Sequence, residues 1–308
     1  MAHSSTYKQV RSNIVLIIAA VMWGFAFVAQ VKASESGIGS FLFNAIRYFL
    51  GALVLIPVIF IFERKQITRA VFRRSLVAGL ISGTVMMAAV NVQQYGISLN
   101  QNAGTSGFIS SFYIVFIPIV TALIFRQKVN IRSWLAVAIA FVGLFLISVP
   151  LGTSVFNTKE LLGEALLMLC AIFWTAHILS VDRFSKDSCP ILFAFLQFAF
   201  CSIISLVFAL FVDEISLSVI SGSLYPILYG GFISVGIAYT FQVLGQRDAS
   251  AVVTSIAMAG EAVFAAVGGF LFMGEEMSFQ QVIGAGMMCL AILLPQINIK
   301  KRKKQEQC

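Results

Sequence analysis

The chain has 308 residues, of which 59% are hydrophobic and 11% charged, and its mean hydropathy is +0.94. Soluble domains carry about a quarter charged residues, so this composition argues against a soluble globule of this size. The net charge of +8 could indicate a nucleic-acid partner. The basic residues, however, stand in short segments between apolar runs and form no basic face, and we therefore expect no nucleic acid as a partner.

Ten apolar runs follow one another along the chain, each long enough to cross a bilayer as a helix of about 20 residues. Helices are required there because lipid offers the backbone no water partner. In chain order, the predicted spans cover residues 14–31, 40–62, 75–97, 103–125, 133–150, 161–181, 190–212, 224–245, 250–273 and 279–297. The sequence thus predicts an all-α integral membrane protein with ten transmembrane helices. No cleavage pattern follows the first run, which we expect to be retained.

Almost all of the 21 basic residues fall on one side of this predicted arrangement. That side holds Lys8, Arg11, Arg64, Lys65, Arg69, Arg73, Arg74, Arg126, Lys128, Arg132, Arg183, Lys186, Arg247 and the tail residues Lys300, Lys301, Arg302, Lys303 and Lys304. The opposite side holds only Lys32 and Lys159. Because basic loops stay in the cytoplasm, we expect a multi-pass protein of the inner (cytoplasmic) membrane with both termini cytoplasmic.

The two halves of the chain can be aligned with each other. Trp23 in VMWGFAFVAQ pairs with Trp174 in AIFWTAHILS, and a shift of 148 positions pairs Gln94 with Gln242. Five helices is an odd number, so a second half that begins outside must be inverted relative to the first. We therefore expect two inverted five-helix repeats, residues 1–155 and residues 156–308, with a substrate site between them near the membrane midplane.

The sequence resembles the ten-helix EamA-type branch of the drug/metabolite transporter superfamily over essentially its whole length. The resemblance is carried by MWGFAF, RYFLGALVLIP and the final GEAVFAAVGGFLFMGEE followed by QQVIGAGMMCLAIL. Two positions depart from the pattern: Ala262 stands where the family often has proline, and Arg126-Gln127-Lys128 replaces a common acidic turn. The resemblance implies a transporter with a central cavity lined by spans one, three, four, six, eight and nine, but it does not supply the substrate.

Glu261 is the strongest candidate for a functional residue. At about 1.5 Å per residue it lies about 16 Å into span nine, near the centre of the bilayer. A carboxyl at that depth is costly when ionised, which makes it a candidate for proton coupling. The alternative is a structural role, in which a hydrogen-bonded Glu261 braces the helix contacts around Gly260. Both interpretations stay open from the sequence.

Arg47 lies inside span two, about 10 Å deep. We expect a structural role, or a side chain that extends outward to the membrane surface. Pairing with Glu261 or with a substrate carboxylate is the alternative. His177 shares a helical face with Trp174, and we expect it at the membrane interface near Asp182.

Aromatic and amide side chains provide the remaining candidates for substrate binding. Aromatic rings offer apolar area and cation–π attraction, whereas amides offer hydrogen bonds. Many of these side chains could instead face lipid or hold helices together. The predicted substrate-binding residues are Trp23, Phe27, Asn91, Gln94, Tyr95, Tyr113, Trp174, Tyr239 and Gln242.

We expect a secondary active transporter that moves amino acids, drugs or related metabolites by alternating access, in the direction of export. Uptake or exchange on the same fold is the alternative. The sequence has no GxxxxGK[ST] or HExxH motif, no cysteine pattern typical of a metal site, and no repeated pore ring, so an enzyme, a cofactor or a channel is not expected. The expected partners are the solute, the lipid bilayer and protons, and the protein is expected to be a monomer or a homodimer.

Overall fold

The computed structural model describes residues 2–148 and 158–294, and within these ranges the chain is helical and contains no strand. The elements are α1 (Ala2–Glu35), α2 (Ser40–Phe62), η1 (Arg64–Gln66), α3 (Arg69–Asn100), α4 (Ala103–Ser110), α5 (Tyr113–Leu123), α6 (Ile131–Ser148), α7 (Thr158–Phe184), η2 (Ser185–Asp187), α8 (Pro190–Val212), α9 (Leu217–Gly222), α10 (Leu224–Leu228), the π-helix η3 (Tyr229–Tyr239), α11 (Thr240–Gln246), α12 (Ala251–Met258), α13 (Glu261–Met273) and α14 (Phe279–Leu293). This confirms the predicted all-helical class.

Eight helical segments are long and apolar enough to cross a membrane, and two shorter apolar helices, Ile131–Ile147 and Phe279–Leu293, lie at the fifth and tenth predicted positions. The chain is therefore a multi-pass membrane protein. The predicted ends of those two spans, at residues 150 and 297, fall outside the described residues. So do the boundary between residues 155 and 156 and the basic tail at 300–304.

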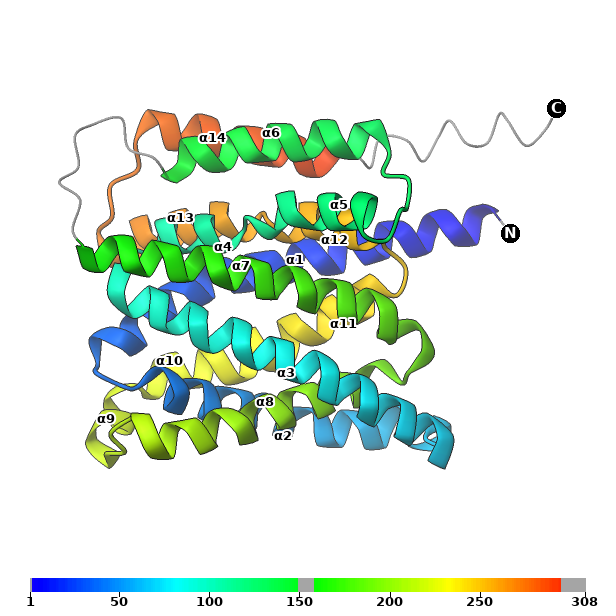
Figure 1. Ribbon diagram of the computed structural model, residues 1–308, viewed down its shortest axis with the longest axis horizontal. Coiled ribbons are helices and arrows are strands. Elements are labelled where there is room, and N and C mark those ends of the chain that lie inside the picture. Colours follow the sequence, from blue (N-terminus) through cyan, green and yellow to red (C-terminus); the bar gives the residue numbers. More distant parts are fainter. Residues whose placement is uncertain (1, 149–157, 295–308) are drawn as a thin grey trace.

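The helices pack as a layered bundle (Figure 1). At one edge α6 packs against α14, and at the opposite edge α2 packs against α8. Between these pairs lie α1, α4, α5, α7, α12 and α13, and α3 packs against both α7 and α8. Early and late parts of the chain are thus interleaved, and the centre of the bundle is built from both.

The fourth and ninth predicted spans, expected to be continuous, are each broken in the middle. The first break separates α4 from α5, and there the amide of Ile114 donates to the carbonyl of Ser111 at 3.0 Å. The second break separates α12 from α13, and the amide of Ala262 donates to the carbonyl of Ala259 at 3.2 Å. These bonds join residues three apart instead of four, so the backbone tightens at both breaks. A broken helix is tolerated at membrane depth where protein surrounds it.

Two acidic residues, one directly after α2 and one directly after α8, each accept hydrogen bonds from the start of the other helix. Glu63, which follows α2, accepts hydrogen bonds from the amides of Ile191 (2.9 Å) and Leu192 (2.8 Å) at the start of α8. Asp213, which follows α8, accepts one from the amide of Leu42 (2.7 Å) at the start of α2. The first amides of a helix lack internal partners and attract negative charge. Each helix therefore ends on a carboxylate that stabilises the beginning of the other, which requires the two to run antiparallel.

Candidate functional site

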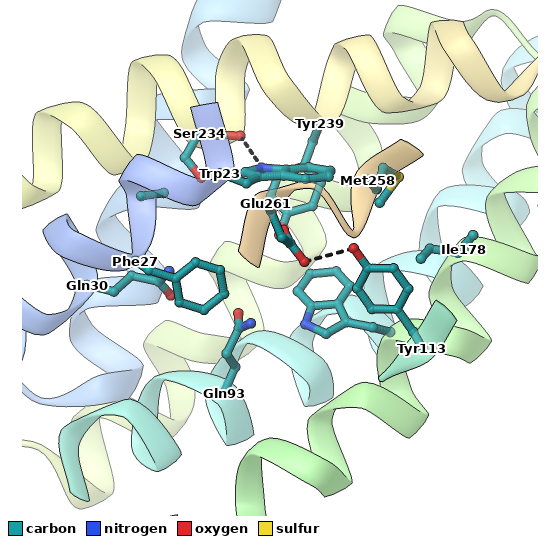
Figure 2. Close-up of a pocket in the computed structure, with 12 residues that line it drawn as sticks. Trp23, Phe27, Gln30, Gln93, Tyr113, Ile178, Ser234, Tyr239, Met258 and Glu261 are labelled. Atoms are coloured by element: carbon teal, nitrogen blue, oxygen red, sulfur yellow. Dashed lines mark hydrogen bonds between the residues drawn. The ribbon is translucent and has the colours of Figure 1, made fainter. Parts of the chain in front are cut away.

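A small cavity lies in the middle of the bundle (Figure 2). Its walls come from α1, α3 and α5 in the first half of the chain and from α7, η3, α12 and α13 in the second half. The lining residues are Trp23, Ala26, Phe27, Gln30, Gln93, Tyr113, Trp174, Ile178, Ser234, Tyr239, Met258 and Glu261. The space inside is about 30 Å³, enough for only a few water molecules. A larger solute can enter only if the surrounding helices move apart.

Three aromatic rings form one wall of the cavity. The ring centroids of Trp23 and Tyr239 are 4.5 Å apart, and Trp174 stacks on Tyr239 at 5.8 Å with an interplanar angle of 21°. The indole nitrogen of Trp23 donates to the carbonyl of Ser234 at 3.2 Å, which fixes the ring against η3. Stretches of π-helix are frequent at functional sites, and this one supplies both Ser234 and Tyr239 to the cavity.

Glu261 is the only ionisable carboxyl among the lining residues, and it is 6% exposed. Its Oε1 accepts hydrogen bonds from the hydroxyls of Tyr113 (2.8 Å) and Ser111 (3.3 Å). No basic residue lines the cavity, so an ionised Glu261 would have neutral donors but no counter-charge. The site therefore favours a bound proton or a cation at this carboxyl. Elsewhere in the described residues no three histidine, cysteine or acidic side chains gather as metal ligands.

The structure brings together six of the ten residues singled out from the sequence, namely Trp23, Phe27, Tyr113, Trp174, Tyr239 and Glu261. In Figure 2, Phe27 and Tyr113 flank the space into which Glu261 points. The helix breaks explain how this happens, because Tyr113 begins α5 and Glu261 begins α13.

The other four predicted binding residues lie away from the cavity. Asn91 bonds to the Oγ of Ser205 and to a neighbouring asparagine of α2, and so links helices. Gln94 donates to the carbonyl of Gln30, and Gln242 donates to a glutamine one turn further along α11. Tyr95 is 51% exposed on the outside of the bundle. The physical reason is helical spacing: Asn91, Gln94 and Tyr95 share a helix face that does not point to the cavity.

Residues that the sequence reasoning missed also line the site. Gln30 follows Trp23 by seven positions and Phe27 by three, so helical periodicity could have found it. Gln93 is not among the predicted substrate-binding residues, yet its amide points into the cavity (Figure 2). Met258 contributes from the end of α12 through the helix break, which the sequence did not reveal.

His177 packs inside the bundle, against α8 and the aromatic wall of the cavity. It is fully buried, its Nε2 pairs with the Oε1 of Gln197 at 3.1 Å, and its ring stands edge-on to Trp174 at 5.4 Å. Its helix α7 extends to Phe184, beyond the predicted end of that span at residue 181. Through its contact with Trp174, His177 supports the aromatic wall of the cavity.

Arg47 is also buried, at 2% exposure, and the expectation that it extends outward is wrong. Its Nε donates to the Oδ1 of Asn44 at 2.7 Å, and its guanidinium lies 5.1 Å from the ring centroid of Phe43 and 5.2 Å from that of Tyr48. Cation–π contacts and an amide oxygen thus replace the acidic partner that a buried charge usually has. The expected structural role fits these contacts, and Arg47 does not line the cavity.

Comparison with known proteins gives a consistent result. A model of the EamA-like transporter family matches two stretches of the chain, residues 10–149 and 161–295. A protein of Archaeoglobus fulgidus is 27% identical over 295 residues, covering 95% of this chain and 88% of the relative. YoaV of Bacillus subtilis is 23% identical over 295 residues, covering 94% and 97%. Both are described as uncharacterized transporters. A solved crystal structure with 13% identity superposes with a TM-score of 0.72 over 96% of this chain and 99% of that one, so it shares the fold.

Proposed function

The chain belongs to the EamA-like transporter family, and from this premise we propose that it is a secondary carrier that moves a small solute through the cavity around Glu261. The family resemblance read from the sequence motifs is thereby confirmed. The proposed solutes are amino acids, drugs or related metabolites. The sequence has no nucleotide-binding GxxxxGK[ST] motif, so the proposed energy source is a gradient of the solute or of an ion.

The observation that carries this proposal is the cavity itself. It lies where early and late helices meet, it holds one carboxyl without a counter-charge, and it is too small for a solute in the described conformation. A carrier passes through such a closed state between two open ones. A channel would instead need a continuous polar path lined by repeated groups.

We propose further that the chain consists of two inverted five-helix repeats, residues 1–155 and residues 156–308, which together span the membrane ten times. The family model matches once in each half. Local geometry repeats at an offset of 148 positions. Asn102 and Ser250 each cap the helix that follows, through hydrogen bonds at 2.7 and 3.4 Å. Arg126 and Gly274 each have positive φ, 52° and 71°.

The reciprocal caps formed by Glu63 and Asp213 support the same arrangement. These residues are 150 positions apart, each follows the second helix of its proposed half, and each stabilises the start of the other's helix. Equivalent helices that run antiparallel are the mark of inverted repeats. Together with the distribution of basic residues, this supports a cytoplasmic location for both termini and a place in the cytoplasmic membrane.

In the proposed mechanism, the two halves exchange between inward-open and outward-open states of comparable energy. Glu261 would take up a proton on one side and release it on the other, so that the proton gradient drives the solute. Each charge moved through a potential of 100 mV contributes about 2.3 kcal/mol, enough for roughly 50-fold accumulation. The proposed direction is export. Uptake or exchange uses the same fold and is the alternative. The carrier would work as a monomer or a homodimer.

Transport by everted membrane vesicles tests this proposal. Vesicles with and without the protein are given radiolabelled amino acids and amphipathic drugs, each with and without a protonophore. If the protein is a proton-coupled exporter, at least one solute should accumulate only in vesicles that contain the protein, and the protonophore should abolish this accumulation. Accumulation only in right-side-out vesicles would instead support uptake, and counterflow without accumulation would support exchange.

A further inference from the structure

A second cleft lies at one end of the bundle, where the start of α3 meets the end of α7. It is lined by Arg69, Ala70, Arg73, Arg74, Val77, Ala78, Arg183, Phe184, Asp187 and Ser188. Its volume is about 790 Å³, so it is far larger than the central cavity. None of these residues takes part in the proposed transport site.

The cleft has a strong excess of positive charge. Four arginines line it, but only one carboxylate, that of Asp187. Asp187 lies 3.7 Å from Arg183, and both side chains are more than 70% exposed, so this pair neutralises little. Within the part of the chain that the structure describes, Arg69, Arg73 and Arg74 have no acidic partner. The cleft is therefore suited to an anion.

The position of these arginines favours an external anion over an internal use. Arg69, Arg73 and Arg74 occupy the first two turns of α3, where the helix dipole repels positive charge. Thr68 already caps this helix by accepting the amide of Val71. The arginines thus do not stabilise α3. The rule that basic residues stay cytoplasmic explains their side of the membrane, but not why three of them line one cleft with Arg183.

An apolar track leads from the cleft along the outside of α3. Val77 and Ala78 form part of the cleft's floor, and Val77 is 51% exposed. Leu80 and Ile81, one turn further on, are also exposed, which continues the apolar strip in the direction of the bilayer core. Phe184 borders the opposite side. A ligand that fits both features has a negative head and a long apolar chain.

The geometry points to this cleft as a binding site for an anionic phospholipid. The headgroup phosphate lies among Arg69, Arg73 and Arg74, where guanidinium groups bind phosphate oxygens in pairs. One acyl chain follows the exposed strip that starts at Val77 and continues along Leu80. Basic pockets between transmembrane helices are known to suit such headgroups. This inference concerns the lipid and not the transported solute, and it stands whether or not the transport mechanism holds.

The test measures lipid binding by the full-length protein. The purified chain is placed in zwitterionic nanodiscs, and dioleoylphosphatidylglycerol or dioleoylphosphatidylcholine with matched acyl chains is titrated and counted by native mass spectrometry. The triple variant Arg69→Gln/Arg73→Gln/Arg74→Gln removes the charge of the cleft. Because each basic residue near a membrane contributes about fivefold to anionic lipid binding, the triple variant should weaken binding on the order of a hundredfold.

A second triple variant, Arg126→Gln/Lys128→Gln/Arg132→Gln, serves as the matched control. It removes the same charge from the α5–α6 connection and the first turn of α6, which lie at the same end of the bundle but outside the cleft (Figure 1). The control variant should keep most of the preference for phosphatidylglycerol. Equal losses in both triple variants would overturn the site, and so would equal binding of the two lipids by the natural chain. If glycerol phosphate competed as strongly as the phospholipid, the proposed contact between an acyl chain and the strip from Val77 to Leu80 would be wrong.

Discussion

The hydroxyl of Tyr113 donates a 2.8 Å hydrogen bond to the Oε1 of Glu261, and these two residues are 148 positions apart in the chain. This separation equals the offset that pairs Asn102 with Ser250 as helix caps. Each of the bonded residues begins the second segment of a broken helix, α5 for Tyr113 and α13 for Glu261. The bond therefore joins equivalent positions of the two proposed halves.

A contact between equivalent positions has a physical consequence for transport. If the halves are inverted repeats, the pseudo-twofold axis passes close to this bond, so both halves must move relative to each other around it. A proton or solute on Glu261 then changes the hydrogen bonds from Tyr113 and Ser111 that link the two broken helices there. This arrangement ties the occupancy of the carboxyl to the movement of the helices.

Replacement of the carboxyl should separate coupling from binding. Glu261→Gln keeps the size of the side chain and a hydrogen-bond acceptor for Tyr113, but it cannot release a proton. We expect gradient-driven accumulation to be lost, while counterflow of solute between equal concentrations continues. Tyr113→Phe is the companion variant: it keeps the carboxyl, so accumulation should continue at a lower rate. Undiminished accumulation by Glu261→Gln would remove this residue from the coupling mechanism.

The two cavity tryptophans should determine solute preference. Trp23→Ala and Trp174→Ala each remove a ring that packs against Tyr239, which enlarges the cavity and removes apolar contact area. Each variant should change the relative transport of different solutes by about tenfold or more, an effect of about 1.4 kcal/mol. Trp134→Ala on α6, which does not line the cavity, is the control and should leave the preference unchanged. Identical preferences in all three variants would mean that the rings serve packing alone.

Neighbouring glutamines of α3 should have different roles. Gln93 lines the cavity, whereas Gln94 donates to the carbonyl of Gln30 and to the Oγ of Ser34. Gln93→Ala should raise the solute concentration needed for half-maximal transport and leave thermal stability nearly unchanged. Gln94→Ala should lower the free energy of unfolding by about 0.6–2 kcal/mol, because two interhelical hydrogen bonds are lost. The reverse pattern in thermal unfolding and transport assays would contradict the placement of these side chains.

The reciprocal caps should contribute to stability in similar amounts. Glu63→Gln and Asp213→Asn each replace a carboxylate at a helix N-terminus with a neutral amide, and each should cost about 0.5–2 kcal/mol. Glu214→Gln, next to Asp213 but exposed, is the matched control and should have little effect. Thermal unfolding in detergent provides the measurement. Equal melting temperatures for Asp213→Asn and Glu214→Gln would show that the cap stabilises nothing.

The sequence could predict the helices, but not which side of each helix faces the protein core and which side faces lipid. Apolar runs revealed the spans because lipid demands them. In a soluble helix the polar face also indicates the outside, but here lipid and core are equally apolar. Phe43 is fully buried while Phe60 on the same helix is 63% exposed, and no difference of residue type separates them. For the same reason the sequence could not distinguish Gln93 from Gln94.

The helix breaks were the other feature beyond the reach of the sequence. Neither Ser111 nor Gly260 is a strong helix breaker in such an apolar setting, and the tightened turns persist because neighbouring helices surround them. The breaks nonetheless determine the site, since they bring Glu261, Tyr113 and Met258 to one cavity. Glu261 itself was predictable, because an ionised carboxyl deep in an apolar run is energetically costly and such residues are therefore candidates for a function.

The inverted arrangement of the two halves is the central claim, and side-specific labelling tests it most directly. Single cysteines replace Lys65, Lys186, Ser36 and Ser216 in turn, in a chain whose own five cysteines have been exchanged, and intact cells and everted vesicles are treated with a membrane-impermeant maleimide. We predict that positions 65 and 186 react only in everted vesicles and that positions 36 and 216 react in intact cells. Labelling of positions 65 and 186 from opposite faces would contradict inversion and the mechanism built on it.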